Sequence, residues 1–149
     1  MANKAYAEEW LSFAAKELET AALLLDAGHY TDIIGITLQQ TLEKSLKALF
    51  AAANIKIPRD HDLVRIAYLL EDRIDFEENE IMLLRIASDY YKAERYPNPN
   101  YFLPAEEEIR EIFDFSLSVY IRCCETAGIK IDRDNVPTLK TSTNSKGIS

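Results

Sequence analysis

The sequence predicts an all-α fold: an up-and-down four-helix bundle with an additional short helix and a Pro-rich loop before the last helix. Apolar residues recur at spacings of three and four along most of the chain, and no run alternates convincingly with period two. Of the 149 residues 48% are hydrophobic, whereas only 4 are Gly and 5 are Pro. This composition is typical of one globular domain and excludes disordered and collagen-like chains.

The first two helices are predicted from residue 3 to about residue 28 and over residues 32–53. Asn3 can cap the first helix, and Gly28 suits a C′ position because glycine tolerates a left-handed conformation. Thr31 can cap the second helix, and Pro58 breaks it. The apolar stripe of the first helix comprises Ala7, Leu11, Ala14, Leu18, Ala21 and Leu25.

A short third helix follows Asp60, which offers a new N-cap, and a fourth helix is predicted over residues 77–93. The fourth helix is entered through Asp75 and Glu78, which have capping-box spacing. The third helix carries the apolar residues Leu63, Ile66, Ala67 and Leu70.

Three of the five prolines fall within residues 92–104, which predicts a structured loop. Pro104 suits the first turn of a fifth helix, and Gly128 can end that helix. The domain is therefore predicted over residues 1–128, with a polar and disordered tail over residues 129–149.

The second helix is apolar nearly all round, yet it carries a line of polar residues. Gln40, Lys44 and Lys47 are spaced i, i+4, i+7, and Glu43 precedes Lys47 by four residues, the favourable order for a helix ion pair. One interpretation is a solvated strip with a weak surface ion pair. The alternative is the floor of a groove, whose ammonium groups and amide suit phosphate oxygens. Ile33, Ile36 and Ala48 border the line and favour the groove.

Two further groups are candidates for ligand contact. His61, between two aspartates, either caps its own backbone at the start of the third helix or contacts a base or phosphate. An aromatic cluster with one cation, which can stack a nucleobase or pair with phosphate, is formed by Tyr90, Tyr91, Arg95 and Tyr96. The same residues could instead pin the loop to the bundle.

Several classes of protein are excluded. The net charge is −8, which argues against coating duplex DNA, and no apolar run is long enough for a membrane span. Cys123 and Cys124 are adjacent and point in different directions on a helix, which excludes a disulfide framework and a two-cysteine zinc site. We therefore expect a cytoplasmic protein with no metal and no cofactor.

Residues 39–49, QQTLEKSLKAL, resemble the second helix of the HEPN family, the "higher eukaryotes and prokaryotes nucleotide-binding" domains. Further matches are the His-Asp-Leu at residues 61–63 and the Tyr-Tyr at residues 90–91 followed by Arg-Tyr-Pro at residues 95–97. The resemblance covers roughly residues 5–127 in helix order and spacing. Thr41 and Leu42 depart from it, because small alanines are usual there.

The resemblance implies a four-helix bundle that is commonly a homodimer, and in many relatives a partner of a minimal nucleotidyltransferase. Other relatives are ribonucleases with an Arg-x(4–6)-His motif. Neither His29 nor His61 has an arginine at the required positions, so this chain departs from the nuclease pattern. Without that motif a binding role is favoured over an enzymatic one.

These observations lead to three hypotheses. The first is a non-catalytic HEPN subunit that binds a nucleotide or RNA and works with a nucleotidyltransferase in substrate binding or as a toxin–antitoxin pair. Its predicted ligand-binding residues are Gln40, Lys44, Lys47, His61, Tyr91, Arg95 and Tyr96. The second is a divergent HEPN ribonuclease in which His61 or Arg95 acts within a rearranged site. The third is a structural dimerisation module.

Overall fold

The structure, a computed structural model, describes the backbone of residues 3–95 and 103–131, together with their side chains except those of residues 92–95. It contains α1 (Asn3–Asp26), α2 (Thr31–Ala53), α3 (Leu63–Leu69), α4 (Glu78–Arg95) and α5 (Glu106–Thr126). No strand occurs within the described ranges. The predicted all-α architecture of four main helices and a short one is confirmed.

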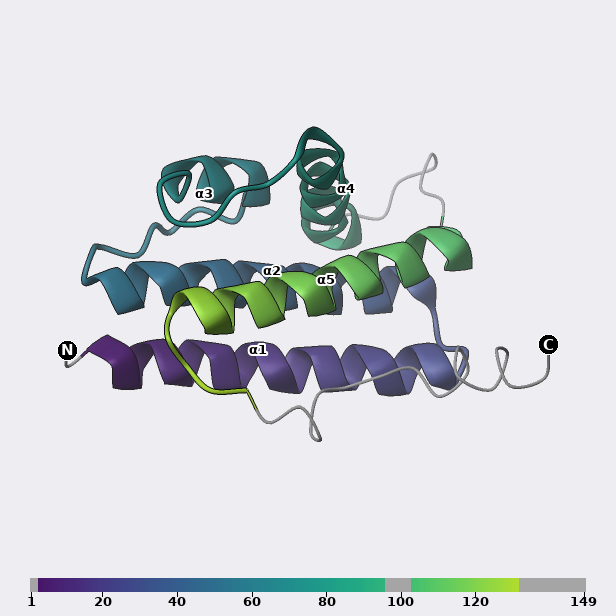
Figure 1. Ribbon diagram of the computed structural model, residues 1–149. Coiled ribbons are helices and arrows are strands. Elements are labelled where there is room, and N and C mark those ends of the chain that lie inside the picture. The colour runs from purple at the N-terminus through teal and green to yellow at the C-terminus, as the bar shows by residue number, and fades with distance from the viewer. Residues whose placement is uncertain (1–2, 96–102, 132–149) are drawn as a thin grey trace.

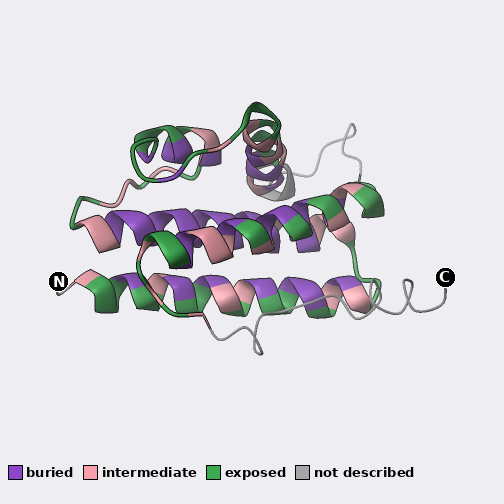
Figure 2. Cartoon of the chain, viewed as in Figure 1, coloured by how far each residue is buried: buried purple, intermediate pink, exposed green. Residues whose placement is uncertain are grey.

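Three of the long helices lie side by side, and the fourth crosses them. In Figure 1, α1, α2 and α5 run lengthwise across the view, whereas α4 is seen nearly end-on beside α3. α2 is packed against all four other helices and is the most buried of them, as the nearly continuous purple along it in Figure 2 shows. A helix that is apolar nearly all round belongs either in the middle of a bundle or at a subunit interface, and α2 lies in the middle. Polar side chains on α2 therefore meet different neighbours on its different sides.

Gly35 allows α4 to approach α2 closely. A Cβ atom at this position would lie 2.9 Å from Cγ of Tyr90 and 3.0 Å from Cδ2 of the same ring. Tyr90 is buried, and its hydroxyl donates a hydrogen bond to Glu108 of α5. Burial and the Glu108 carboxylate both raise the pKa of Tyr90, which stays a neutral donor. The ring thus joins α2, α4 and α5.

The caps of α3 and α4 differ from those predicted. Asp62, not Asp60, caps α3, because its carboxylate accepts from the backbone N–H groups of Val64 and Arg65. Asp60 instead accepts from the N–H of Asp62 and pairs with Arg65. At α4 the backbone N–H of residue 77 donates to Oε1 of Glu80 at 3.0 Å, so the reciprocal side chain of the capping box is Glu80 rather than Glu78.

The ends of the other helices combine local and distant contacts. Gly28 and Gly128 have φ angles of +68° and +71°, as their predicted roles require, and Asn54 ends α2 with a φ angle of 60°. The Thr31 hydroxyl does not cap α2; it donates to the backbone oxygen of Pro104 at 2.7 Å. That bond ties the beginning of α2 to the segment that leads into α5.

The predicted loop and the predicted tail can be compared with the structure only in part. Most of the predicted Pro-rich loop lies outside the described residues, and so does the predicted tail from residue 132 onward. Ile129 and Ile131, which begin that tail, pack against the hydrophobic core. Among the described residues, no helix is both long and apolar enough to cross a membrane.

Candidate functional site

A buried carboxylate on α2 organises a polar cluster in an otherwise apolar surrounding. Glu43 accepts hydrogen bonds from Nε2 of Gln39 at 2.8 Å and from Nζ of Lys47 at 2.9 Å. Nδ1 of His61, in the segment that leads into α3, lies 3.1 Å from both carboxylate oxygens. Gln40 extends the network by donating to Oε1 of Gln39 at 2.6 Å. We call Gln39, Gln40, Glu43, Lys47 and His61 the Glu43 cluster.

The buried part of this cluster is charge-balanced. Glu43 is 6% exposed and Lys47 is 5% exposed, so both charges are withdrawn from water and compensate each other. Burial alone would raise the pKa of the Glu43 carboxyl, but hydrogen bonds from Lys47, Gln39 and His61 outweigh burial and hold its pKa below the ordinary value. Glu43 is therefore an ionised acceptor at neutral pH.

The ionised carboxylate fixes the orientation of the His61 ring. A carboxylate can only accept, so Nδ1 of His61 carries the hydrogen that points at Glu43. This leaves Nε2 as the nitrogen available to another molecule. The side chain is 47% exposed, and its ring stacks on Tyr91 of α4, with ring centroids 4.6 Å apart and an interplanar angle of 23°.

The backbone around His61 is held by two helices. Its carbonyl oxygen accepts from Nε2 of Gln39 on α2 and from Oγ of Ser88 on α4, each at 3.5 Å. The Ser88 hydroxyl in turn accepts from the N–H of Leu63 at 3.1 Å. An imidazole ring on an irregular segment is thus positioned by contacts to two regular elements, which favours a defined rather than a variable geometry.

The structure brings together four of the seven predicted ligand-binding residues. Gln40, Lys47, His61 and Tyr91 belong to or touch the Glu43 cluster. Tyr96 and the side chain of Arg95 lie outside the described residues.

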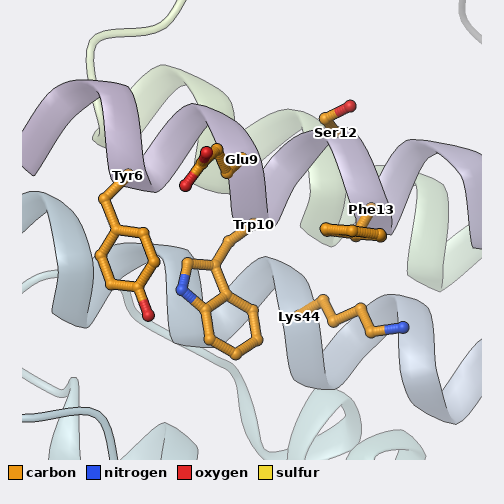
Figure 3. A pocket seen from close by; sticks show the side chains of 6 residues that line it. All are labelled: Tyr6, Glu9, Trp10, Ser12, Phe13 and Lys44. Atoms are coloured by element: carbon orange, nitrogen blue, oxygen red, sulfur yellow. The ribbon is translucent and has the colours of Figure 1, made fainter.

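Lys44 lies apart from the Glu43 cluster. Its ammonium forms an ion pair with Glu17 of α1 at 3.0 Å and lies 5.8 Å from the centre of the Phe13 ring (Figure 3). Helical spacing alone suggested one basic line, but α2 has a different neighbour on each side of that line. Lys44 meets α1, whereas Lys47 bonds to Glu43.

Glu43 and Gln39 are the residues that the sequence-based site omitted. The sequence identified Glu43 only as an ion-pair partner of Lys47, although it accepts from Gln39, Lys47 and His61. The sequence did contain a signal for these two residues. Gln39 and Glu43 are spaced i, i+4 on a helix that is apolar nearly all round, and polar side chains that are buried there must find partners.

Acid is expected to weaken this cluster. Because the pKa of Glu43 is lower in the folded chain than its ordinary value of 4.5, its contribution to stability is present above that value and is lost as the pH falls through the folded-state pKa. The gap in unfolding free energy between the wild type and Glu43→Gln should therefore shrink below about pH 4. Urea titrations across this range measure the gap, and a gap independent of pH would contradict the prediction.

Comparisons with known proteins bear on the family and on the fold. Residues 7–125 match the HEPN domain family. TT1696 from Thermus thermophilus has a similar crystal structure, with a TM-score of 0.70 and 24% identity over 80% of this chain and 97% of that chain. The structure of ST0689, an archaeal HEPN homologue, is similar with a TM-score of 0.63 and 20% identity, over 81% of this chain and 97% of that chain.

No curated protein matches the sequence. At identities this low the likeness to solved structures establishes the fold, and the family match establishes the relationship. The match extends from the first turns of α1 to the last turn of α5 and includes the whole Glu43 cluster. The chain therefore belongs to the HEPN family.

Proposed function

We propose that this HEPN chain binds a nucleotide, or the end of a single RNA strand, at the edge formed by His61 and Tyr91. The observation that carries the proposal is the half-exposed His61 ring, which is oriented by a buried carboxylate and stacked on a tyrosine. An aromatic face suits a nucleobase, and Nε2 of the imidazole can accept a hydrogen bond from a ribose hydroxyl or from the exocyclic amino group of a base. The ligand class is the one predicted from the sequence, a nucleotide or RNA, but the residues proposed to contact it differ from those predicted.

The reassignment concerns the two lysines. The ammonium of Lys47 is buried and bonded to Glu43, so its role is to balance the carboxylate rather than to neutralise phosphate directly. Lys44 is paired with Glu17 toward α1. Among the described side chains, His61, Tyr91 and the half-buried Gln40 lie where they can contact a ligand. These described groups suit a small ligand better than a duplex, whose phosphate backbone requires an excess of cations.

The partnership with a nucleotidyltransferase rests on the family resemblance. In such a pair this chain would hold the acceptor or the nucleotide, and the partner would supply the transfer chemistry. Co-purification with a nucleotidyltransferase encoded by a neighbouring gene tests the partnership separately from ligand binding.

His61→Ala is expected to weaken nucleotide binding at least about tenfold, or roughly 1.4 kcal/mol. Isothermal titration with adenosine 5′-monophosphate and with a short single-stranded RNA measures the change. His29→Ala is the matched control, because His29 is exposed and contacts the Tyr30 ring at the other end of α2. Equal affinity in the wild type and in His61→Ala, or no binding by the wild type, would refute the proposed site.

The hydrogen bond between Glu43 and His61 also favours a second candidate, a divergent ribonuclease. A carboxylate that orients an imidazole is the arrangement of a general base, and the half-exposed ring leaves Nε2 as the nitrogen that does not contact Glu43. Incubation with labelled RNA distinguishes the two functions. Cleavage by the wild type that is lost in His61→Ala and retained in His29→Ala would show that the chain is a ribonuclease.

A further inference from the structure

Two surface pockets differ in the charges that line them. The larger is a groove of about 520 Å³ between α1 and α2, and charges of both signs accompany the aromatic residues that line it, Tyr6, Trp10 and Phe13 (Figure 3). The other is a pocket of about 370 Å³ where the segment after α3 leads into α4, which we call the α3–α4 pocket. In Figure 1, α3 and α4 lie on the side of α2 away from α1. The charged groups that line the α3–α4 pocket among the described residues are all acids, which indicates the kind of molecule that it can accept.

The α3–α4 pocket has an apolar floor beside exposed apolar side chains. The floor residues are buried or pack against the hydrophobic core, and they are Ala67, Ile74, Phe76 and Ile81. Tyr68 also lines the pocket and is 58% exposed. Leu69 and Met82, each next in sequence to a lining residue, are 59% and 52% exposed. Large apolar side chains that gather on an exposed surface usually mark an interaction site.

The rim of the pocket is formed by unpaired carboxylates. Glu71, Asp75 and Glu78 line the pocket and are exposed, and none of their carboxylates has an ion pair or a hydrogen bond within the described part of the chain. Of the ten residues 71–80, six are acids and one is a base. Among the described residues, no group of three His, Cys, Asp or Glu side chains could hold a metal ion. The carboxylates therefore suit several cationic groups at separate positions rather than one ion.

Helix stability accounts for only part of this acidity. Glu78 lies in the first turn of α4, where the helix dipole favours a negative charge, and Glu80 is paired with Arg122 of α5. Glu71 directly follows Leu70, the C-cap residue of α3, so its charge lies at the end of a helix where a negative charge is unfavourable. A cation supplied by another molecule therefore explains Glu71 better than α3 itself does.

We propose that the α3–α4 pocket binds a segment of a partner protein that carries an apolar side chain flanked by lysine or arginine. The apolar side chain fills the pocket, and the flanking cations pair with Glu71, Asp75 and Glu78 at its rim. The exposed ring of Tyr68 offers its face to the same cations. Each kind of group that the pocket presents thus has a counterpart in the occupant.

Other classes of occupant match the pocket less well. A phosphate backbone carries the same sign of charge as the rim and is repelled. A polyamine would pair with the carboxylates but would leave Leu69 and Met82 uncovered. The pocket shares no lining residue with the Glu43 cluster, and the proposal does not depend on nucleotide binding at His61.

Labelled synthetic peptides test the proposal by fluorescence anisotropy. A peptide of lysine and leucine should show saturable binding, a matched peptide of lysine and serine should bind at least about tenfold more weakly, and a peptide of glutamate and leucine should not bind. The second peptide keeps the charge and lacks the apolar anchor. Equal affinity for the two lysine peptides, or no binding of the lysine–leucine peptide, would overturn the proposal. Spermidine that binds as tightly as the lysine–leucine peptide would overturn it in favour of a polyamine site.

Substitutions at the rim test the location. Glu71→Lys and Tyr68→Ser should each weaken binding of the lysine–leucine peptide at least about tenfold, and both side chains are exposed, so the fold should be retained. Glu111→Lys is the matched control, because it makes the same change of charge at an exposed position of α5 and should bind the peptide as the wild type does. An equal loss in Glu71→Lys and Glu111→Lys would show non-specific attraction to an acidic protein and would overturn the proposal.

Disulfide trapping places the peptide directly. Both native cysteines are buried, and burial raises the pKa of each thiol, so a cysteine introduced on the surface is the reactive one. A lysine–leucine peptide whose terminal cysteine is activated as a pyridyl disulfide should react with Glu71→Cys at least about tenfold faster than with Glu111→Cys, because binding raises its effective concentration. Equal rates would place the peptide elsewhere and overturn the proposal.

Discussion

Glu43→Ala is expected to destabilise the chain by about 3–5 kcal/mol, because it leaves the Lys47 ammonium buried without its carboxylate. Lys47 is 5% exposed, and its ammonium forms an ion pair with Glu43. His61 and Gln39 would lose an acceptor at the same time. Urea denaturation gives the change in unfolding free energy.

A double-mutant cycle separates the stranded charge from the lost volume. Glu43→Ala combined with Lys47→Met should lose less stability than Glu43→Ala alone, because no ammonium remains to be stranded. A more exposed ion pair of α2, between Lys44 and Glu17, is the control. Lys44 and Glu17 are 22% and 31% exposed, so Glu17→Ala should cost no more than about 1 kcal/mol. If the losses of unfolding free energy in the two single variants add up to the loss in the double variant, the interaction between Glu43 and Lys47 does not stabilise the fold.

Gly35→Ala is expected to lower the unfolding free energy by about 1–3 kcal/mol, although alanine is the better helix former. The new Cβ would lie 2.9 Å from Cγ of Tyr90. Cγ is the ring atom nearest the protein backbone, so it is the one least able to move. The hydroxyl of Tyr90 is also held by Glu108. Thermal and chemical unfolding both measure the loss.

Gly35→Ala should stabilise the chain, rather than destabilise it, when the Tyr90 ring is removed. In a Tyr90→Ala background, Gly35→Ala meets no ring, and helix propensity should then favour alanine by up to about 1 kcal/mol. If Gly35→Ala destabilises both backgrounds equally, close packing of α4 on α2 is not the reason for the glycine.

The helices could be predicted because their signals are local. Apolar spacing within α1 and α5, the left-handed glycines at residues 28 and 128, and Pro58 depend on residues within one or two turns. The apolar character of α2 indicated either the middle of the bundle or a subunit interface, and α2 occupies the middle. These features follow from the chain itself, whatever it packs against.

The caps and the site could be predicted only in part, because their partners are distant in sequence. The Thr31 hydroxyl has a capping residue's chemistry, but it donates instead to the backbone oxygen of Pro104, which is 73 residues away. In the same way, the spacing of Lys44 and Lys47 showed that they share a side of α2. It could not show that Glu17 of α1 lies next to Lys44. Nor could it show that His61 approaches Glu43, the partner of Lys47.

The position of Trp10 has a practical consequence. The chain contains one tryptophan, and its indole ring lines the groove between α1 and α2. Intrinsic fluorescence excited at the indole band therefore reports on a single location, without a label or a substitution. A change in this emission would report any molecule that covers the groove, and a spectrum unchanged by nucleotide would show that the ligand edge at His61 acts independently of it.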